Sequence, residues 1–164
     1  MTYLKIMSRR PRKQEADALA PMKKKLLGLK KMNSRKLDEL FHESHAKEFK
    51  TRDCLACANC CKTTSPIFRD VDINRISKRL GMKSQKFVEQ YLRMDEEQDY
   101  VLQSSPCTFL NADNTCSIYE DRPMACREYP HTDRKNMYQI LDLTVRNISV
   151  CPAVEAIARE ITKE

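Results

Sequence analysis

The sequence predicts a small, irregular single domain of the α+β class, predominantly helical and organised around a cysteine–metal centre. Three observations support this prediction. The chain has 164 residues, the usual size of one domain. It contains eight cysteines but only two glycines and no tryptophan. Most of its apolar residues recur at helical spacing, and only a few short stretches alternate as strands do.

The expected helices follow this apolar spacing. Ser34, Asp70 and Ser84 are the residue types that cap helices, and a proline such as Pro152 suits a first helical turn. Gly81 is expected to end the second helix. The residues expected to face inward are Leu37, Leu40 and Phe41; Val71, Ile73, Ile76 and Leu80; Phe87, Val88, Tyr91 and Leu92; Met137, Ile140, Leu141, Val145 and Ile148; and Val154, Ile157, Ala158 and Ile161.

Extended segments are expected in two places. A short strand is predicted at Tyr100–Leu102, and a hairpin is predicted from Cys107–Leu110 and Cys116–Tyr119 around the turn residues 111–114. Leu141, Leu143 and Val145 also alternate, so a strand there is an alternative to a helix.

Positive charge is confined to the start of the chain. Residues 1–33 contain ten Lys or Arg and two acidic residues, whereas residues 34–164 are close to neutral. Because Pro11, Pro21 and a run of lysines interrupt it, we expect residues 1–33 to form a basic N-terminal arm, partly disordered or a short helix. Residues 34–164 are the expected cysteine-cluster metal-binding domain. The arm suits weak contact with nucleic acid or another anionic surface, and a simply solvated extension is the favoured alternative.

Several classes of protein are excluded by composition. Gly28 and Gly81 are 53 positions apart, too far to build a phosphate-binding loop. No apolar run approaches the ~18 residues of a membrane span. The N-terminus also has no apolar core of a secretory signal, so we expect a cytoplasmic protein whose thiols stay reduced.

The cysteines carry the chemical prediction. Four lie within eight residues, and a two-residue gap lets both sulfurs of a Cys-x-x-Cys reach one ion at ~2.3 Å. In a reducing compartment such clusters bind metal more often than they form disulfides. The predicted metal ligands are Cys54, Cys57, Cys60, Cys61, Cys107, Cys116, Cys126 and Cys151.

The identity of the metal is left open by the spacing. Two four-thiolate zinc sites would use all eight cysteines, and zinc is the preferred ion. Iron, or an iron–sulfur cluster, is the alternative, because Cys54, Cys57 and Cys60 followed by a remote Cys151-Pro152 are similar to a ferredoxin arrangement. His45, on the apolar face of the first expected helix, suits either a supplementary ligand or, more simply, a hydrogen-bonded core residue.

The ordered landmarks resemble a known family. They are Cys54-x-x-Cys57-x-x-Cys60-Cys61, Cys107-x-x-Leu110, Cys116-Ser117-Ile118-Tyr119, Arg122-Pro123, Cys126-Arg127, Tyr129-Pro130 and Cys151-Pro152. Over residues 50–155 this pattern is similar to the YkgJ-type cysteine-cluster family, the zinc- or iron-chelating domain named for its CxxCxxCC signature. The resemblance implies a cytoplasmic bacterial metal-binding domain. Ala58 and Ala153 stand where relatives often have glycine.

Whether the protein is an enzyme is left open. Some members of the family resemble flagellin lysine methylases, so a methyltransferase-like or redox activity of an iron–sulfur protein is the first alternative function. A nucleic-acid adaptor using the basic arm is the second. The polar segment around Cys126 is expected to support the sulfurs by hydrogen bonds rather than to catalyse a reaction. Its residues are Tyr119, Arg122, Arg127, Tyr129 and His131.

Overall fold

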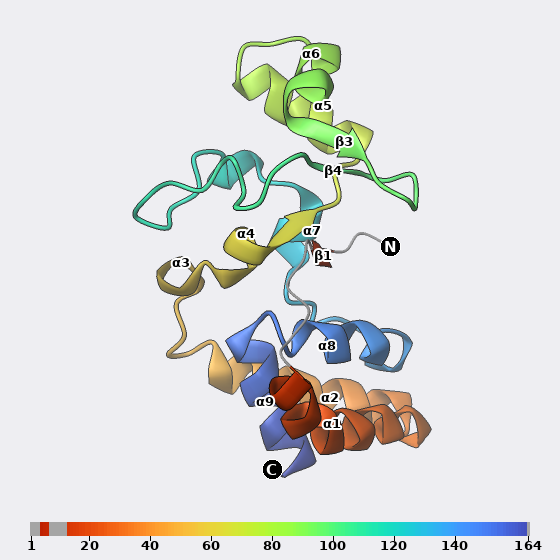
Figure 1. Cartoon of the computed structure of the whole chain (residues 1–164). Helices are drawn as coiled ribbons and strands as arrows, with labels where there is room; N and C mark the ends of the chain where they lie inside the picture. The colour runs from red at the N-terminus through yellow and green to blue at the C-terminus, as the bar shows by residue number, and fades with distance from the viewer. Residues whose placement is uncertain (1–3, 7–12, 164) are drawn as a thin grey trace. The chain divides into compact units, whose positions relative to one another are not determined.

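The computed structural model describes residues 4–6 and 13–163 (Figure 1). As predicted, the fold is of the α+β class and predominantly helical, and its strands form two two-stranded sheets. The chain divides into two compact units. We call residues 1–9 and 54–129 the cysteine unit, and residues 10–53 and 130–164 the helical unit. Among the described residues, no helix is both long and apolar enough to cross a membrane.

The helical unit is built from four α-helices and two 3-10 turns. Its elements are α1 (Lys13–Gly28), η1 (Leu29–Lys31), α2 (Ser34–Glu48), η3 (Met137–Gln139), α8 (Leu141–Asn147) and α9 (Pro152–Thr162). Helix α9 packs against both α1 and α2, and α8 packs against α1 (Figure 1). The helical alternative for the stretch around Leu141 is therefore correct, and the strand alternative is wrong.

Apolar side chains from all four helices form the interior of this unit. The faces predicted for the first and last helices are confirmed: Leu37 and Phe41 of α2 are fully buried, and so are Val154 and Ile157 of α9. Helix α1 contributes in the same way, because its Met22 is also buried. The described part of the basic arm thus includes a helix with a buried side, while the separation of residues 1–33 from 34–164 as domains stays a prediction.

Two histidines of α2 hydrogen-bond to the segment that precedes η3. His45 Nδ1 lies 2.8 Å from Thr132 Oγ1, and its ring packs on Phe49 with 4.5 Å between centroids. His42 Nε2 donates to the carbonyl oxygen of Arg134 at 2.9 Å. The interpretation of His45 as a hydrogen-bonded residue is confirmed, and it lies in the helical unit.

The cysteine unit consists of short elements. They are β1 (Leu4–Ile6), α3 (Cys54–Cys57), α4 (Asn59–Thr63), β2 (Thr64–Pro66), α5 (Asp70–Arg79), α6 (Ser84–Tyr91), β3 (Leu92–Met94), β4 (Tyr100–Leu102), η2 (Tyr119–Asp121) and α7 (Met124–Glu128). Strand β1 pairs antiparallel with β2, with Lys5 opposite Ser65. Strand β3 pairs antiparallel with β4, with Arg93 opposite Val101. The predicted strand at residues 100–102 is confirmed, whereas β1, β2 and β3 were not predicted.

A hydrophobic cluster supports one side of this unit. Its aromatic centre includes Phe87, which stacks on Phe109 with 6.3 Å between ring centroids. Cys107 and Cys116 pack against the cluster, so it supports part of the cysteine site. The buried members are Phe68, Ile73, Ile76, Phe87, Leu92, Leu102, Phe109 and Ile118.

Some local predictions for the cysteine unit are wrong. Val71 is 60% exposed, because it lies two residues from buried Ile73 and therefore on the opposite side of α5. Leu92 is buried but in strand β3 rather than at the end of a helix. The hairpin expected around residues 111–114 is reduced to a single antiparallel bridge between Leu110 and Cys116.

The helix starts are displaced by one residue from the predicted caps. Ser34, Asp70 and Ser84 are the first helical residues and not the residues before them. At α2 the cap is Asn33, whose side-chain oxygen accepts from the N–H of Lys36 at 3.2 Å. Asn is as good a capping residue as Ser, and here it is one position closer to the preceding turn.

Candidate metal centre

The CxxCxxCC segment folds as two short helices joined at Ala58. Ala58 has a φ of 46°, in the left-handed region that favours glycine. Its N–H donates to the carbonyl oxygen of Cys54 at 2.8 Å, and its own carbonyl oxygen accepts from Lys62 at 3.1 Å. Glycine would adopt this conformation without the strain that alanine carries. Ala153 lies in the first turn of α9, where alanine needs no special conformation.

A second segment of the chain is joined directly to this one. The N–H of Cys107 donates to the carbonyl oxygen of Cys61 at 2.8 Å, and Ser105 Oγ donates to that of Lys62 at 3.0 Å. These two bonds bring Cys107 beside the last cysteine of the cluster. Cys116 follows on the far side of the turn, opposite Leu110.

The third segment is helix α7, which carries Cys126. Its first turn is closed by the N–H of Cys126, which donates to the carbonyl oxygen of Pro123 at 2.9 Å. The interpretation of Arg122-Pro123 as a turn with an anchored arginine is confirmed. Arg122 donates to the carbonyl oxygen of Tyr119 at 2.6 Å, and its guanidinium carbon lies 3.9 Å from the centre of that ring.

The three segments enclose one cavity of about 230 Å³. Phe68, Phe109 and Ile118 form part of its apolar wall, and Arg122 and Arg127 add two cations. The cavity brings together six of the predicted ligands, namely Cys54, Cys60, Cys61, Cys107, Cys116 and Cys126.

The other two predicted ligands are placed differently. Cys57 is half-buried and is not among the residues lining the cavity, although it ends helix α3 beside it. Cys151 is buried in the helical unit, immediately before α9. Within residues 4–6 and 13–163, no three His, Cys, Asp or Glu side chains stand in the close arrangement of ligands around one ion. The donor chemistry of the cavity suits a soft metal, and binding would require the thiol side chains to turn toward a common point.

The thiols differ in how readily they lose a proton. A hydrogen bond from Cys60 lowers the pKa of Cys61 to about 7, against the opposing effect of burial and with a smaller contribution from Lys62. Burial raises the pKa of Cys107 to about 11. Burial also raises the pKa of Cys116, and it raises that of Cys126 well above its usual range, where the neighbouring cysteines add to the effect.

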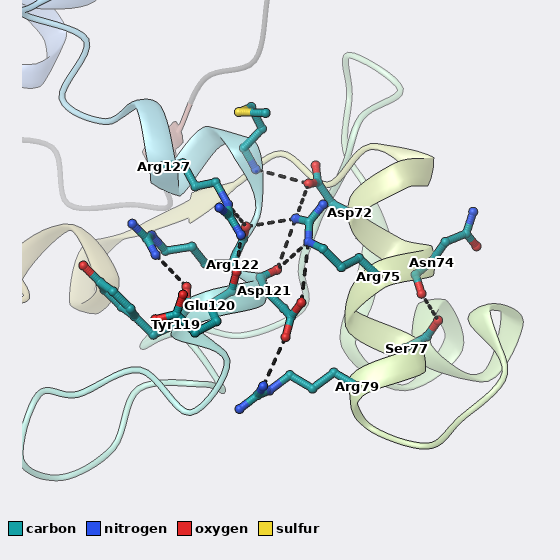
Figure 2. Close-up of polar contacts among 11 residues, drawn as sticks. Asp72, Asn74, Arg75, Ser77, Arg79, Tyr119, Glu120, Asp121, Arg122 and Arg127 are labelled. Carbon is teal, nitrogen blue, oxygen red and sulfur yellow. Dashed lines mark hydrogen bonds and ion pairs between the residues drawn. The ribbon is translucent and has the colours of Figure 1, made fainter.

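Sequence reasoning missed a charged network that joins α5 to the segment around Asp121 and Arg122 (Figure 2). Asp72 of α5 is completely buried and accepts a hydrogen bond from Arg75 Nη2 at 2.7 Å. Arg75 also donates to backbone carbonyl oxygens of the segment between the two cysteines. The spacing of Asp72 and Arg75, three residues apart on a helix with an apolar face, was the available indication.

A comparison with protein families agrees with this donor set. The family described as "CxxCxxCC: Putative zinc- or iron-chelating domain" matches residues 53–147. The chain belongs to this CxxCxxCC family. The predicted resemblance is thereby confirmed. The matched span of the CxxCxxCC domain includes all the predicted ligands except Cys151. Searches of curated proteins and of solved structures found no match.

Proposed function

We propose that the protein binds zinc or iron through the thiolates of its cysteine unit, with zinc as the preferred ion. The single observation that carries this proposal is the cavity that is lined by six cysteines from three segments of the chain. Soft thiolate ligands favour zinc and iron over magnesium or calcium. The seven predicted cysteines of the cysteine unit are the proposed ligands, so that Cys57 joins the six that line the cavity. Cys151, in the helical unit, stays a separate prediction.

The number of thiols exceeds what one ion takes. A tetrahedral zinc site uses four thiolates, whereas six cysteines line this cavity. We therefore propose that the cysteines provide ligands for more than one metal ion. Alternatively, some of the thiols support a single site without binding the ion themselves. A zinc ion with four protein thiolates has no open position for water, so its role would be structural, or the ion would be carried as cargo.

Nearby cations favour binding by thiolates. A four-thiolate zinc site carries a formal charge of −2, which cationic side chains offset. Arg122 and Arg127 line the cavity, and Lys62 follows the cluster directly in the chain. Arg127 Nε donates to the carbonyl oxygen of Arg122 at 3.1 Å, so one of these cations helps to hold the turn that carries the other.

The decisive experiment is elemental analysis of protein purified without air. We expect zinc or iron at one or more ions per chain. Zinc-replete protein should be colourless, whereas an iron–sulfur cluster would give a brown protein with visible absorbance and would support the redox or methyltransferase-like alternative. Protein that is folded, reduced and free of transition metal would contradict the proposal.

Single substitutions test the ligand set. Cys126→Ser should lower the metal content, while Ser149→Ala, at an exposed serine of the helical unit, should leave it unchanged. Cys57→Ser and Cys151→Ser test the two cysteines that do not line the cavity, and we expect each to weaken metal binding about 10-fold or more. Unchanged binding in Cys151→Ser would remove Cys151 from the ligand set.

A cytoplasmic location is part of the proposal, because a reducing compartment keeps these thiols available for metal. Weak contact of residues 1–33 with nucleic acid or an anionic surface stays a prediction. Lys24 and Lys31 are exposed there, whereas Lys30 pairs with Asp142 at 2.5 Å. Such contact should weaken steeply with salt.

A further inference from the structure

One side of helix α5 is polar and contacts the chain between Cys116 and Cys126. Asp72, Arg75 and Arg79 follow one another at spacings of three and four residues, so they lie along the same side of the helix (Figure 2). The apolar side of α5 packs into the hydrophobic cluster through Ile73 and Ile76. The helix is therefore fixed by one face and holds the cysteine-bearing segment with the other.

Asp72 is the buried centre of this contact. Its Oδ1 accepts from Arg75 Nη2 at 2.7 Å and from the N–H of Met124 at 3.2 Å. Its Oδ2 accepts from the N–H of Arg69 at 3.2 Å. Met124 is the first residue of α7, so a carboxylate from another helix caps the short helix that carries Cys126.

Arg75 extends the contact along the segment. Its Nε and Nη2 donate to the carbonyl oxygen of Asp121 at 3.2 and 3.1 Å, and Nη2 also donates to that of Arg122 at 2.9 Å. Arg79 adds bonds to Asp121 Oδ2 at 3.1 Å and to the carbonyl oxygen of Ser117 at 3.3 Å. A planar guanidinium can satisfy several acceptors at once in a fixed geometry, which lysine cannot do.

We propose that Asp72 and Arg75 are positioning residues of the metal centre. They hold the backbone from Asp121 to Met124, and with Arg79 on Ser117 they keep the segment between Cys116 and Cys126 at the cavity before the metal binds. This inference rests on the proposed function. Ordering the ligands in advance removes part of the entropy cost of binding, and partners that orient metal ligands typically change affinity 10–100-fold when they are removed.

The first test compares Arg75→Gln with Arg93→Gln, a change at an exposed arginine of β3 in the same unit. Zinc affinity is measured by competition with a chromogenic chelator. We expect Arg75→Gln to bind zinc 10–100-fold more weakly, and Arg93→Gln to match the wild type. Arg75→Lys keeps the charge but not the planar geometry, so it should recover only part of the loss. Wild-type affinity in a folded Arg75→Gln protein would overturn the proposal.

A second variant keeps the test decisive if Arg75→Gln does not fold. Asp72→Asn preserves the shape of the side chain and an acceptor oxygen, but it removes the negative charge from the start of α7. We expect weaker zinc binding with an unchanged circular dichroism spectrum. Wild-type affinity in Asp72→Asn would overturn the proposal in the same way.

A readout without metal separates this inference from the proposed function. In metal-free protein, the alkylation rate of each thiol is measured by peptide mapping. Arg75→Gln should speed the reaction of Cys116 and Cys126 relative to Cys54, whereas Arg93→Gln should not. Unchanged relative rates would refute the positioning role even if the wild type binds zinc. A wild type that binds neither zinc nor iron would refute the proposed function, while the alkylation rates would still decide whether Arg75 positions the two cysteines.

Discussion

Each of the two units is stabilised internally by a different kind of interaction. The helical unit buries apolar side chains from four helices, including Leu26, Phe41 and Ile157. In the cysteine unit a hydrophobic cluster supports one side, and the other side is a cavity lined with thiols. Its α3, α4 and α7 have only four or five residues each, too short to be stable alone.

A bound metal would therefore matter more to one unit than to the other. Long helices with apolar faces can form a core from side-chain burial alone. Short helices that carry thiols need another interaction to fix their positions. A metal ion bound by the thiols would provide one, and the contacts of Asp72 and Arg75 provide another for α7. We therefore expect the stability of the cysteine unit to depend on metal and that of the helical unit to depend on packing.

Removing the metal should have the largest effect. A four-thiolate site couples binding to folding by about 10 kcal/mol or more, so a strong chelator should loosen the cysteine unit. Hydrogen exchange should then become faster in residues 54–63 and 105–129, while residues 152–162 stay protected. Equal loss of protection in both units, or no loss in either, would contradict the expectation that only the cysteine unit depends on metal.

Truncation of a packed aromatic residue comes next. Phe41→Ala should lower the free energy of unfolding of the helical unit by about 3–5 kcal/mol, because Phe41 is fully buried. The loss should be the same with and without chelator in denaturant titrations. Tyr138→Ala, at a 40% exposed aromatic residue of this unit, should cost far less. If the loss of unfolding free energy in Phe41→Ala depended on metal, the helical unit would not be stabilised by packing alone.

Acid should destabilise the helical unit through His131. Burial, followed by the nearby Arg134, lowers the pKa of His131 to about 4. The unfolded chain, with a pKa of about 6.5, then takes up the proton first. The neutral ring makes its full contribution to the free energy of unfolding above about pH 6.5. This contribution, up to ~3 kcal/mol, is lost as the pH falls toward 4.

The measurement is the free energy of unfolding as a function of pH, with chelator present throughout. His131→Asn should flatten the slope between pH 6.5 and 4, because asparagine tolerates the positive φ of this position. Ser149→Ala, at an exposed residue of the unit that does not titrate, should leave the slope in place. An equally steep slope in His131→Asn would assign the acid sensitivity to other groups.

The smallest effect contrasts two alanines, one in each unit. Ala58→Gly relieves a left-handed alanine in the cysteine unit and should stabilise it by up to ~1 kcal/mol. Ala153→Gly places glycine in the helix α9 of the helical unit and should cost about 1 kcal/mol. Thermal melting of both variants checks the opposite signs. Destabilisation by Ala58→Gly would mean that alanine is not strained there.

Much of the fold followed from local patterns. The faces of α2 and α9 were predictable because long amphipathic helices repeat their apolar residues over several turns. The CxxCxxCC family was predictable because its signature of closely spaced cysteines is local in the sequence. Strands β1, β2 and β3 were not predicted. Each has only three residues, too few to show an alternating pattern.

The fold class and the family could be read from the amino-acid sequence, because composition and cysteine spacing are properties of the chain alone. The folded chain was needed to show which cysteines line one cavity and that Asp72 and Arg75 bond to the segment between two of them. Those facts depend on contacts between residues some 50 positions apart, and such contacts are set by packing and buried hydrogen bonds rather than by local spacing.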